Sequence, residues 1–152
     1  THRYSSAASD VYKRQQLNII SIYMNKILVE VSVGELLDKI SILEIKSEKI
    51  KDPEKLSFIN DEYKILKDQL NTNIKNYSEI ESLYNALKEI NLKLWSIEDD
   101  KRLCEKNSDF GEKFIKLSRD VHFLNDERSK IKLEINNKTG SKIREIKEYT
   151  KY

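Results

Sequence analysis

The sequence has few of the residues from which common functional sites are built. It contains one cysteine, two histidines, three glycines and one proline in 152 residues. A single cysteine excludes an internal disulfide and favours a reducing compartment, and this little cysteine and histidine cannot complete a structural zinc site. The three glycines fall near the ends of predicted helices, so they cannot form a phosphate-binding loop. We therefore predict no metal and no cofactor.

Long apolar runs are also lacking. The most apolar early stretch, residues 17–25, is far too short to span a bilayer, and no signal-peptide cleavage site follows it. These absences predict a soluble, cytoplasmic protein that has no membrane association.

The first residues resemble a non-native leader. Residues 5–15, SSAASDVYKRQ, look like a translated sequencing adapter, and the only methionine, Met24, precedes the first well-patterned segment. We therefore expect a leader over 1–23 and a single domain over 24–152. Without the leader, three of 28 basic and one of 26 acidic residues are lost, which leaves 25 of each. An evenly mixed, neutral chain predicts no binding to nucleic acid or to an anionic membrane.

What the sequence does have is apolar residues at helical spacing, above all over residues 94–135. Apolar positions recur there at alternating intervals of four and three, which is typical of helices that pack as in coiled coils. The polar turn Ser108-Asp109-Phe110-Gly111 interrupts the pattern. It predicts two long helices packed as an antiparallel hairpin, around which the rest of the chain is organised.

The flanking segments complete an all-α prediction: an elongated antiparallel bundle of about four helices with a central long hairpin. Helix ends are marked by capping residues, by Pro53 and by Gly140. The expected elements are a short strand over 26–32, a helix from the capping box Ser32–Glu35 to about Lys49, a helix from Asp52-Pro53 to about Asn76, and a helix opened by the capping box Ser78–Glu81. The tail over 141–152 fits either a helix or a strand paired with 26–32.

Several polar residues interrupt the apolar faces and are the candidate site. If the helices run up and down, helix geometry places them in one polar layer inside the bundle. The layer consists of Glu44, Glu98, Asn125 and Arg128, with Arg102 at its edge. One interpretation is a buried ion-pair network that fixes helix register, with Arg128 paired to a glutamate. The other is a pocket for an anionic small molecule.

No catalytic constellation is evident from the sequence. Cys104 and His122 are a poor candidate for a nucleophile and base, because an isolated cysteine in a helix seam is normally inert. A di-iron site would need Glu-x-x-His pairs, and position 119, three residues before His122, is arginine. The sequence leans towards a non-enzymatic protein and names no catalytic residue.

Three large apolar residues lie off the main helical seams: Leu92, Trp95 and Phe123. Exposed apolar surface on long helices is typical of protein contacts. We therefore predict a helical interaction or scaffold module, as a homo-oligomer or with a protein partner, and name these residues as partner contacts. The alternative is a small-molecule-binding or enzymatic bundle that uses the polar layer.

Four segments resemble a known family: GELLDKISILEIK, LWSIEDDKRLCE, DFGEKF and NDERSKIKLEIN, followed by Gly140-Ser141. They are similar to an uncharacterised bacterial family, the domain of unknown function six-one-six-five, over about residues 24–152. The resemblance implies a short, helical, cytoplasmic protein, and it carries over no catalytic residue. A weaker likeness, in architecture only, is to small all-α enzymes of the chorismate mutase type.

Overall fold

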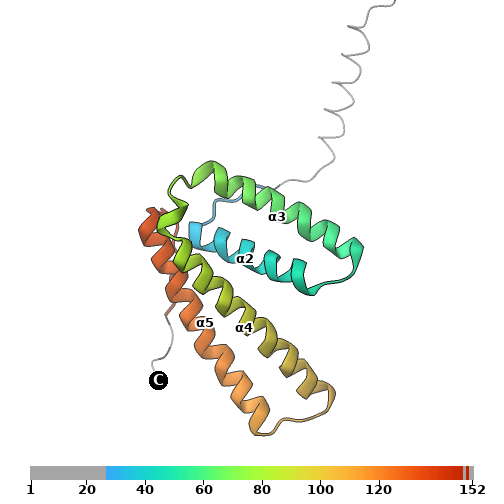
Figure 1. The fold of residues 1–152 in the computed structure, drawn as a ribbon. Coiled ribbons are helices and arrows are strands. Elements are labelled where there is room, and N and C mark those ends of the chain that lie inside the picture. The colour runs from blue at the N-terminus through green and yellow to red at the C-terminus, as the bar shows by residue number, and fades with distance from the viewer. Residues whose placement is uncertain (1–26, 149, 151–152) are drawn as a thin grey trace, which may run out of the picture. The chain divides into compact units, whose positions relative to one another are not determined.

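The structure, a computed structural model, describes residues 27–148 and 150. These residues contain four α-helices and one 3₁₀ turn (Figure 1). The elements are α2 (Val33–Lys49), α3 (Pro53–Asn73), the 3₁₀ turn η1 (Tyr77–Glu79), α4 (Glu81–Lys106) and α5 (Glu112–Thr139). All of them belong to one folded unit, Val31–Tyr152. The all-α prediction is confirmed.

Most helix ends lie where the capping residues predict them. The Glu35 amide donates to Ser32 Oγ at 3.1 Å at the start of α2, and the Glu54 amide donates to Asp52 Oδ1 at 3.0 Å at the start of α3. Helix α5 ends at Gly140, whose φ of 65° is the left-handed conformation that favours glycine. Local chemistry therefore sets these boundaries.

Four local predictions are wrong. Residues 27–32 form no strand, and the described tail from Ser141 onward forms neither a strand nor a helix; Lys26 lies outside the described residues. Helix α3 ends at Asn73 rather than near Asn76. Ser78 lies inside η1 instead of capping α4, which begins at Glu81 without a side-chain cap.

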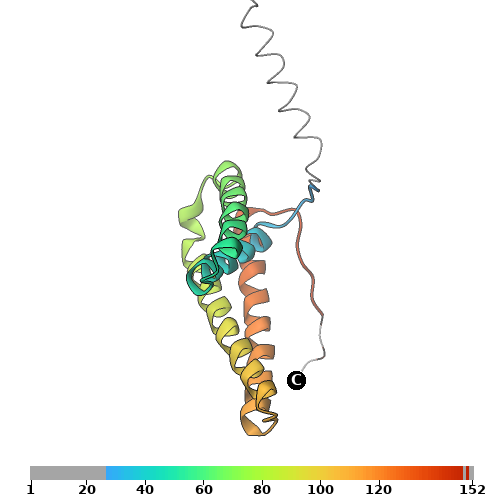
Figure 2. The same cartoon turned by 90° about the vertical axis from the view of Figure 1, so that its right-hand side faces the viewer.

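The helices pack in two pairs. Helices α2 and α3 lie side by side, and α4 and α5 form the predicted hairpin (Figure 1). Helix α2 runs across α4 and α5 rather than along them, as the two views in Figures 1 and 2 agree. The apolar core lies at this crossing and consists of Leu37, Ile40, Leu70, Ile80, Tyr84, Leu87 and Ile135.

Gly34 permits the crossing at its tightest point. A Cβ at this position would lie 2.6 Å from the backbone oxygen of Lys132 and 3.0 Å from Asn136 Oδ1. The Gly34 amide donates to that same Oδ1 at 2.7 Å, so α5 closes the open N-terminal turn of α2. Any larger residue would separate the two helices.

The closed end of the hairpin extends away from α2 and α3 (Figures 1 and 2). We call residues 92–131 the arm, and the remainder of the described unit from Val31 to Gly140 the body. Between residues 95 and 131, Cys104 is the only buried residue, at 3% exposed. The arm is a two-helix element whose apolar seam has no third helix to cover it.

Candidate functional site

A buried polar junction joins α2, α4 and α5 in the body. The Asn91 side chain is 4% exposed and donates through Nδ2 to Asp38 Oδ1 and to Ser41 Oγ, both at 2.8 Å. Its Oδ1 accepts from Arg128 Nη1 at 3.3 Å. Asn91 thus uses both donor hydrogens and its acceptor oxygen, so a polar group that would be costly to bury alone is satisfied.

Lys132 forms the second half of this junction. Its ammonium lies 2.6 Å from Glu35 Oε2, 3.2 Å from Glu145 Oε2 and 3.9 Å from Asp38 Oδ2. Burial alone would lower the pKa of Lys132, but the surrounding carboxylates raise it overall. The lysine therefore stays charged and links α2 and the tail to α5.

Glu44 lies in a separate cluster between α2, α3 and α4. Its carboxylate pairs with Lys88 Nζ at 2.9 Å and accepts a hydrogen bond from the Tyr63 hydroxyl at 3.2 Å. Burial would raise the pKa of Glu44, but the bonds from Lys88 and the tyrosines lower it overall. Burial and the Glu44 charge also raise the pKa of Tyr77 to about 12. The glutamate is held ionised.

The predicted polar layer does not come together as one site. Glu44 pairs with Lys88, and Glu98 pairs with Lys101 at 3.7 Å. The side chain of Asn125 donates through Nδ2 to Val121 O at 2.9 Å, on its own helix. Among the described residues, Arg128 forms no ion pair with either glutamate and bonds Asn91 instead. The prediction assumed helices that run up and down, whereas α2 crosses the hairpin and turns Glu44 towards α3 and α4.

Three of the predicted residues do share a pocket. Glu98, Arg102 and Arg128 line a pocket of about 260 Å³ where α2 meets the hairpin. The rest of its lining is Ile42, Asn91, Leu94, Trp95 and Asp99. Trp95, predicted as a partner contact, therefore lies here beside the arginines.

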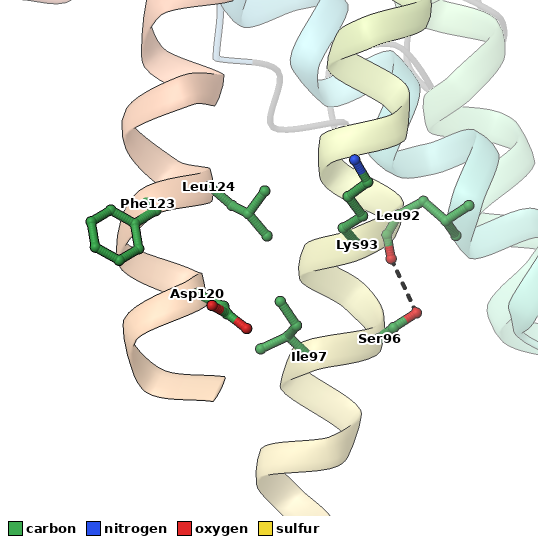
Figure 3. A pocket seen from close by; sticks show the side chains of 7 residues that line it. All are labelled: Leu92, Lys93, Ser96, Ile97, Asp120, Phe123 and Leu124. Carbon is green, nitrogen blue, oxygen red and sulfur yellow. Dashed lines mark hydrogen bonds between the residues drawn. The ribbon is translucent and has the colours of Figure 1, made fainter. Parts of the chain in front are cut away.

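The other two predicted contacts line a larger groove along the arm. Its lining consists of Leu92, Lys93, Ser96 and Ile97 of α4 and of Asp120, Phe123 and Leu124 of α5, and its volume is about 610 Å³ (Figure 3). Ile97 and Leu124 point towards each other between the two helices. A second hollow of about 550 Å³ follows α5 past Phe114, Ile115 and Phe123. The groove has an apolar floor with one basic and one acidic residue on opposite helices.

Other site types find no support in the part of the chain that the structure describes. No three His, Cys, Asp or Glu side chains gather there in a way that could hold a metal ion. None of the described helices is both long enough and apolar enough to cross a membrane. The candidate sites among the described residues are therefore the polar junction, the charged pocket beside Arg128 and the apolar groove.

Asp38, Ser41 and Asn136 are buried polar residues that sequence reasoning missed. Asn91 and Lys132 stand out in the sequence, because they interrupt apolar seams. Asp38, 6% exposed, and Asn136, 2% exposed, give no such signal, because charged and amide residues at helix positions normally face solvent. Only the crossing of α2 over α5 reveals what they bind.

These features define a class: an all-α protein built on a long helical hairpin, with a buried polar junction and an uncovered arm. The chain belongs to the family described as "Family of unknown function (DUF6165)", whose match covers residues 27–152. No curated protein and no solved structure matches the chain.

Proposed function

We propose that this protein is a helical interaction module whose arm pairs with the arm of a second copy. One observation carries the proposal: across residues 95–131 an apolar seam runs along both helices, yet Cys104 is the only buried residue. A helix stripe of this kind is stable when another element covers it. The arm is one half of a four-helix bundle.

The groove supports a second arm as its occupant. Lys93 lies on one side and Asp120 on the other (Figure 3). A twofold axis that places α4 of one copy against α5 of the other brings Lys93 of each copy towards Asp120 of the other. The same surface is then self-complementary, as a closed dimer requires.

The size of the arm is sufficient for such a dimer. Twenty residues of helix span about 30 Å, and two helices are roughly 20 Å wide, so each copy would cover about 600 Å² and the pair about 1,200 Å². That is the lower limit for a specific interface. Exposed apolar side chains available for burial include Leu92 at 38%, Leu103 at 47% and Ile115 at 56%. We therefore expect a reversible dimer with micromolar affinity.

The proposal places the protein in the cytoplasm as a scaffold rather than an enzyme. A lone, buried Cys104 suits a reducing compartment. The apolar groove along the arm supports this proposal.

Sedimentation equilibrium across a concentration series tests the dimer. We expect Leu92→Asp to weaken self-association at least about tenfold, because it puts an unpaired carboxylate into an apolar interface. Ile65→Asp is the matched control, since Ile65 is 57% exposed on α3, outside the arm. It should leave the affinity unchanged.

Two results would contradict the proposal. One is a wild-type protein that stays monomeric at every concentration. The other is a dimer that resists Leu92→Asp and dissociates with Ile65→Asp, which would move the interface to α3.

A further inference from the structure

The pocket at the junction of body and arm is distinct from the groove proposed for dimerisation. Its α4 residues include Asn91, Trp95 and Arg102, whereas the groove uses Leu92, Ser96 and Ile97. At about 100° per residue, these two sets lie on different faces of α4. A molecule in the pocket and a second arm in the groove would therefore not compete.

Arg128 gives the pocket a site for an anion. Its guanidinium has five N–H donors, and one hydrogen bond, from Nη1 to Asn91 Oδ1 at 3.3 Å, is formed. Among the described residues it has no carboxylate partner. Asn91 is itself fixed by Asp38 and Ser41, so the guanidinium is held in place by a buried network. A planar guanidinium held in this way matches the geometry of a carboxylate, which it can bind through two parallel hydrogen bonds.

The rest of the lining specifies the body of the ligand. Leu94, Ile42 and the indole of Trp95 supply apolar surface beside the arginine. The charged lining residues are two acidic, Glu98 and Asp99, and two basic, Arg102 and Arg128, so the lining has no net formal charge. Glu98 also has a cation outside the lining, Lys101 at 3.7 Å. A pocket of about 260 Å³ lies just below the usual range for ligand sites, which limits the ligand to about one ring.

We propose that this pocket binds a small aromatic monocarboxylate, with its carboxylate on Arg128 and its ring against Trp95 and Leu94. Arg128, held by Asn91, orients the ligand, and Trp95 selects a planar, apolar body. The site requires neither a metal nor a dimer. It makes the junction of body and arm a place where a metabolite can bind.

The chain's single tryptophan provides the readout. Trp95 gives the only indole N–H signal in a ¹⁵N–¹H spectrum, and it lies in the pocket. Benzoate is the probe, and we expect a saturable shift of this signal with a dissociation constant of about 1 mM or tighter. Inorganic phosphate, an anion without an apolar body, and benzyl alcohol, a ring without a charge, should each bind at least about tenfold more weakly.

Variants test the role of Arg128. Arg128→Gln should weaken benzoate binding at least about tenfold, while Arg144→Gln, at an exposed arginine outside the pocket, should change it less than about twofold. Arg128→Lys retains the charge and a donor for Asn91. It therefore tests whether binding needs the two parallel hydrogen bonds of the guanidinium, even if the glutamine variant does not fold. Circular dichroism verifies that each variant retains its helices.

Three results would overturn the proposal. They are the absence of a saturable shift up to about 20 mM benzoate, phosphate binding as tight as that of benzoate, and wild-type affinity in a folded Arg128 variant.

Discussion

Helices α4 and α5 pass through both the body and the arm, yet they bury their side chains very differently in the two regions. In the body, Leu87 and Ile135 are fully buried beneath α2. In the arm, Leu103 of α4 is 47% exposed and Ile115 of α5 is 56% exposed. The helical pattern of the sequence is equally good in both regions. Burial is decided by whether another helix crosses the hairpin, so the arm is where a partner would have its effect.

The charged residues differ in the same way. Lys132 in the body, with 9% of its side chain exposed, bonds Glu35 and Glu145 and lies near Asp38. Lys116 in the arm pairs with Asp120 at 2.7 Å, but its side chain is 77% exposed. Similar distances therefore imply different energies, because solvent screens the Lys116 pair more strongly than the pairs of Lys132.

Truncation of apolar side chains should show the largest contrast. Leu87→Ala in the body should lower the free energy of unfolding by about 4 kcal/mol, because it leaves a cavity in a closed core. Ile115→Ala in the arm should lower it by less than about 1 kcal/mol, because solvent already reaches the side chain. Urea unfolding in dilute solution measures both values. Equal losses would show that the arm is as well packed as the body.

The second largest loss of stability is expected when the buried ammonium of Lys132 is removed. Lys132→Met should cost about 3 kcal/mol, because it leaves the buried carboxylate of Asp38 without its nearby cation at the α2–α5 contact. Lys116→Met, at an exposed pair, should cost less than about 0.5 kcal/mol. Thermal unfolding of the two variants compares them directly. A cost for Lys132→Met as small as that for Lys116→Met would mean that the junction contributes little.

Gly34→Ala should reverse the usual effect of removing a helical glycine. Alanine normally stabilises a helix by about 1 kcal/mol relative to glycine. Here the new Cβ would lie 2.6 Å from a Lys132 backbone oxygen, so we expect a loss of about 2 kcal/mol. Gly111→Ala is the control, because its nearest neighbour, Asp109 Oδ1, lies at 3.4 Å. A more stable Gly34→Ala protein would contradict the close approach of α2 and α5.

The smallest effect concerns pH. The folded pKa of Glu44 is below its ordinary value of 4.5, so its contribution is complete above that value and is lost as the pH falls through the folded pKa. Glu44→Gln should therefore cost about 1 kcal/mol at pH 7 and less under acid conditions. Glu89→Gln, at an exposed position on α4, is the control. A Glu44→Gln cost that stays constant down to pH 3 would show that the Lys88 pair is not the cause.

Local sequence signals predicted the helices well and the site only in part. Ser32, Asp52-Pro53 and Gly140 set their helix ends through bonds within a few residues, and such bonds depend on the sequence alone. The wrong assignment of Ser78 has a similar local origin, since a capping-box pattern also fits a 3₁₀ turn.

The site depends on the angle at which α2 crosses the hairpin of α4 and α5, and the sequence does not specify this angle. Asn91 and Arg128 were recognisable, because each interrupts an apolar seam. Their partners follow from the crossing of α2 over the hairpin, which brings Asp38 to Asn91 and turns Glu44 away to Lys88. Periodicity fixes which face of a helix is apolar, but it does not fix how two such faces cross.

Amide hydrogen exchange at several protein concentrations tests the central claim, that the arm is uncovered until a second copy covers it. In dilute solution, amides of residues 95–131 should exchange faster than those of α2 and of 84–91, because few buried contacts hold the arm closed. As the concentration rises through the dimer range, protection should increase across the arm and stay constant in the body. Arm amides that are as protected as the body at every concentration would contradict the account.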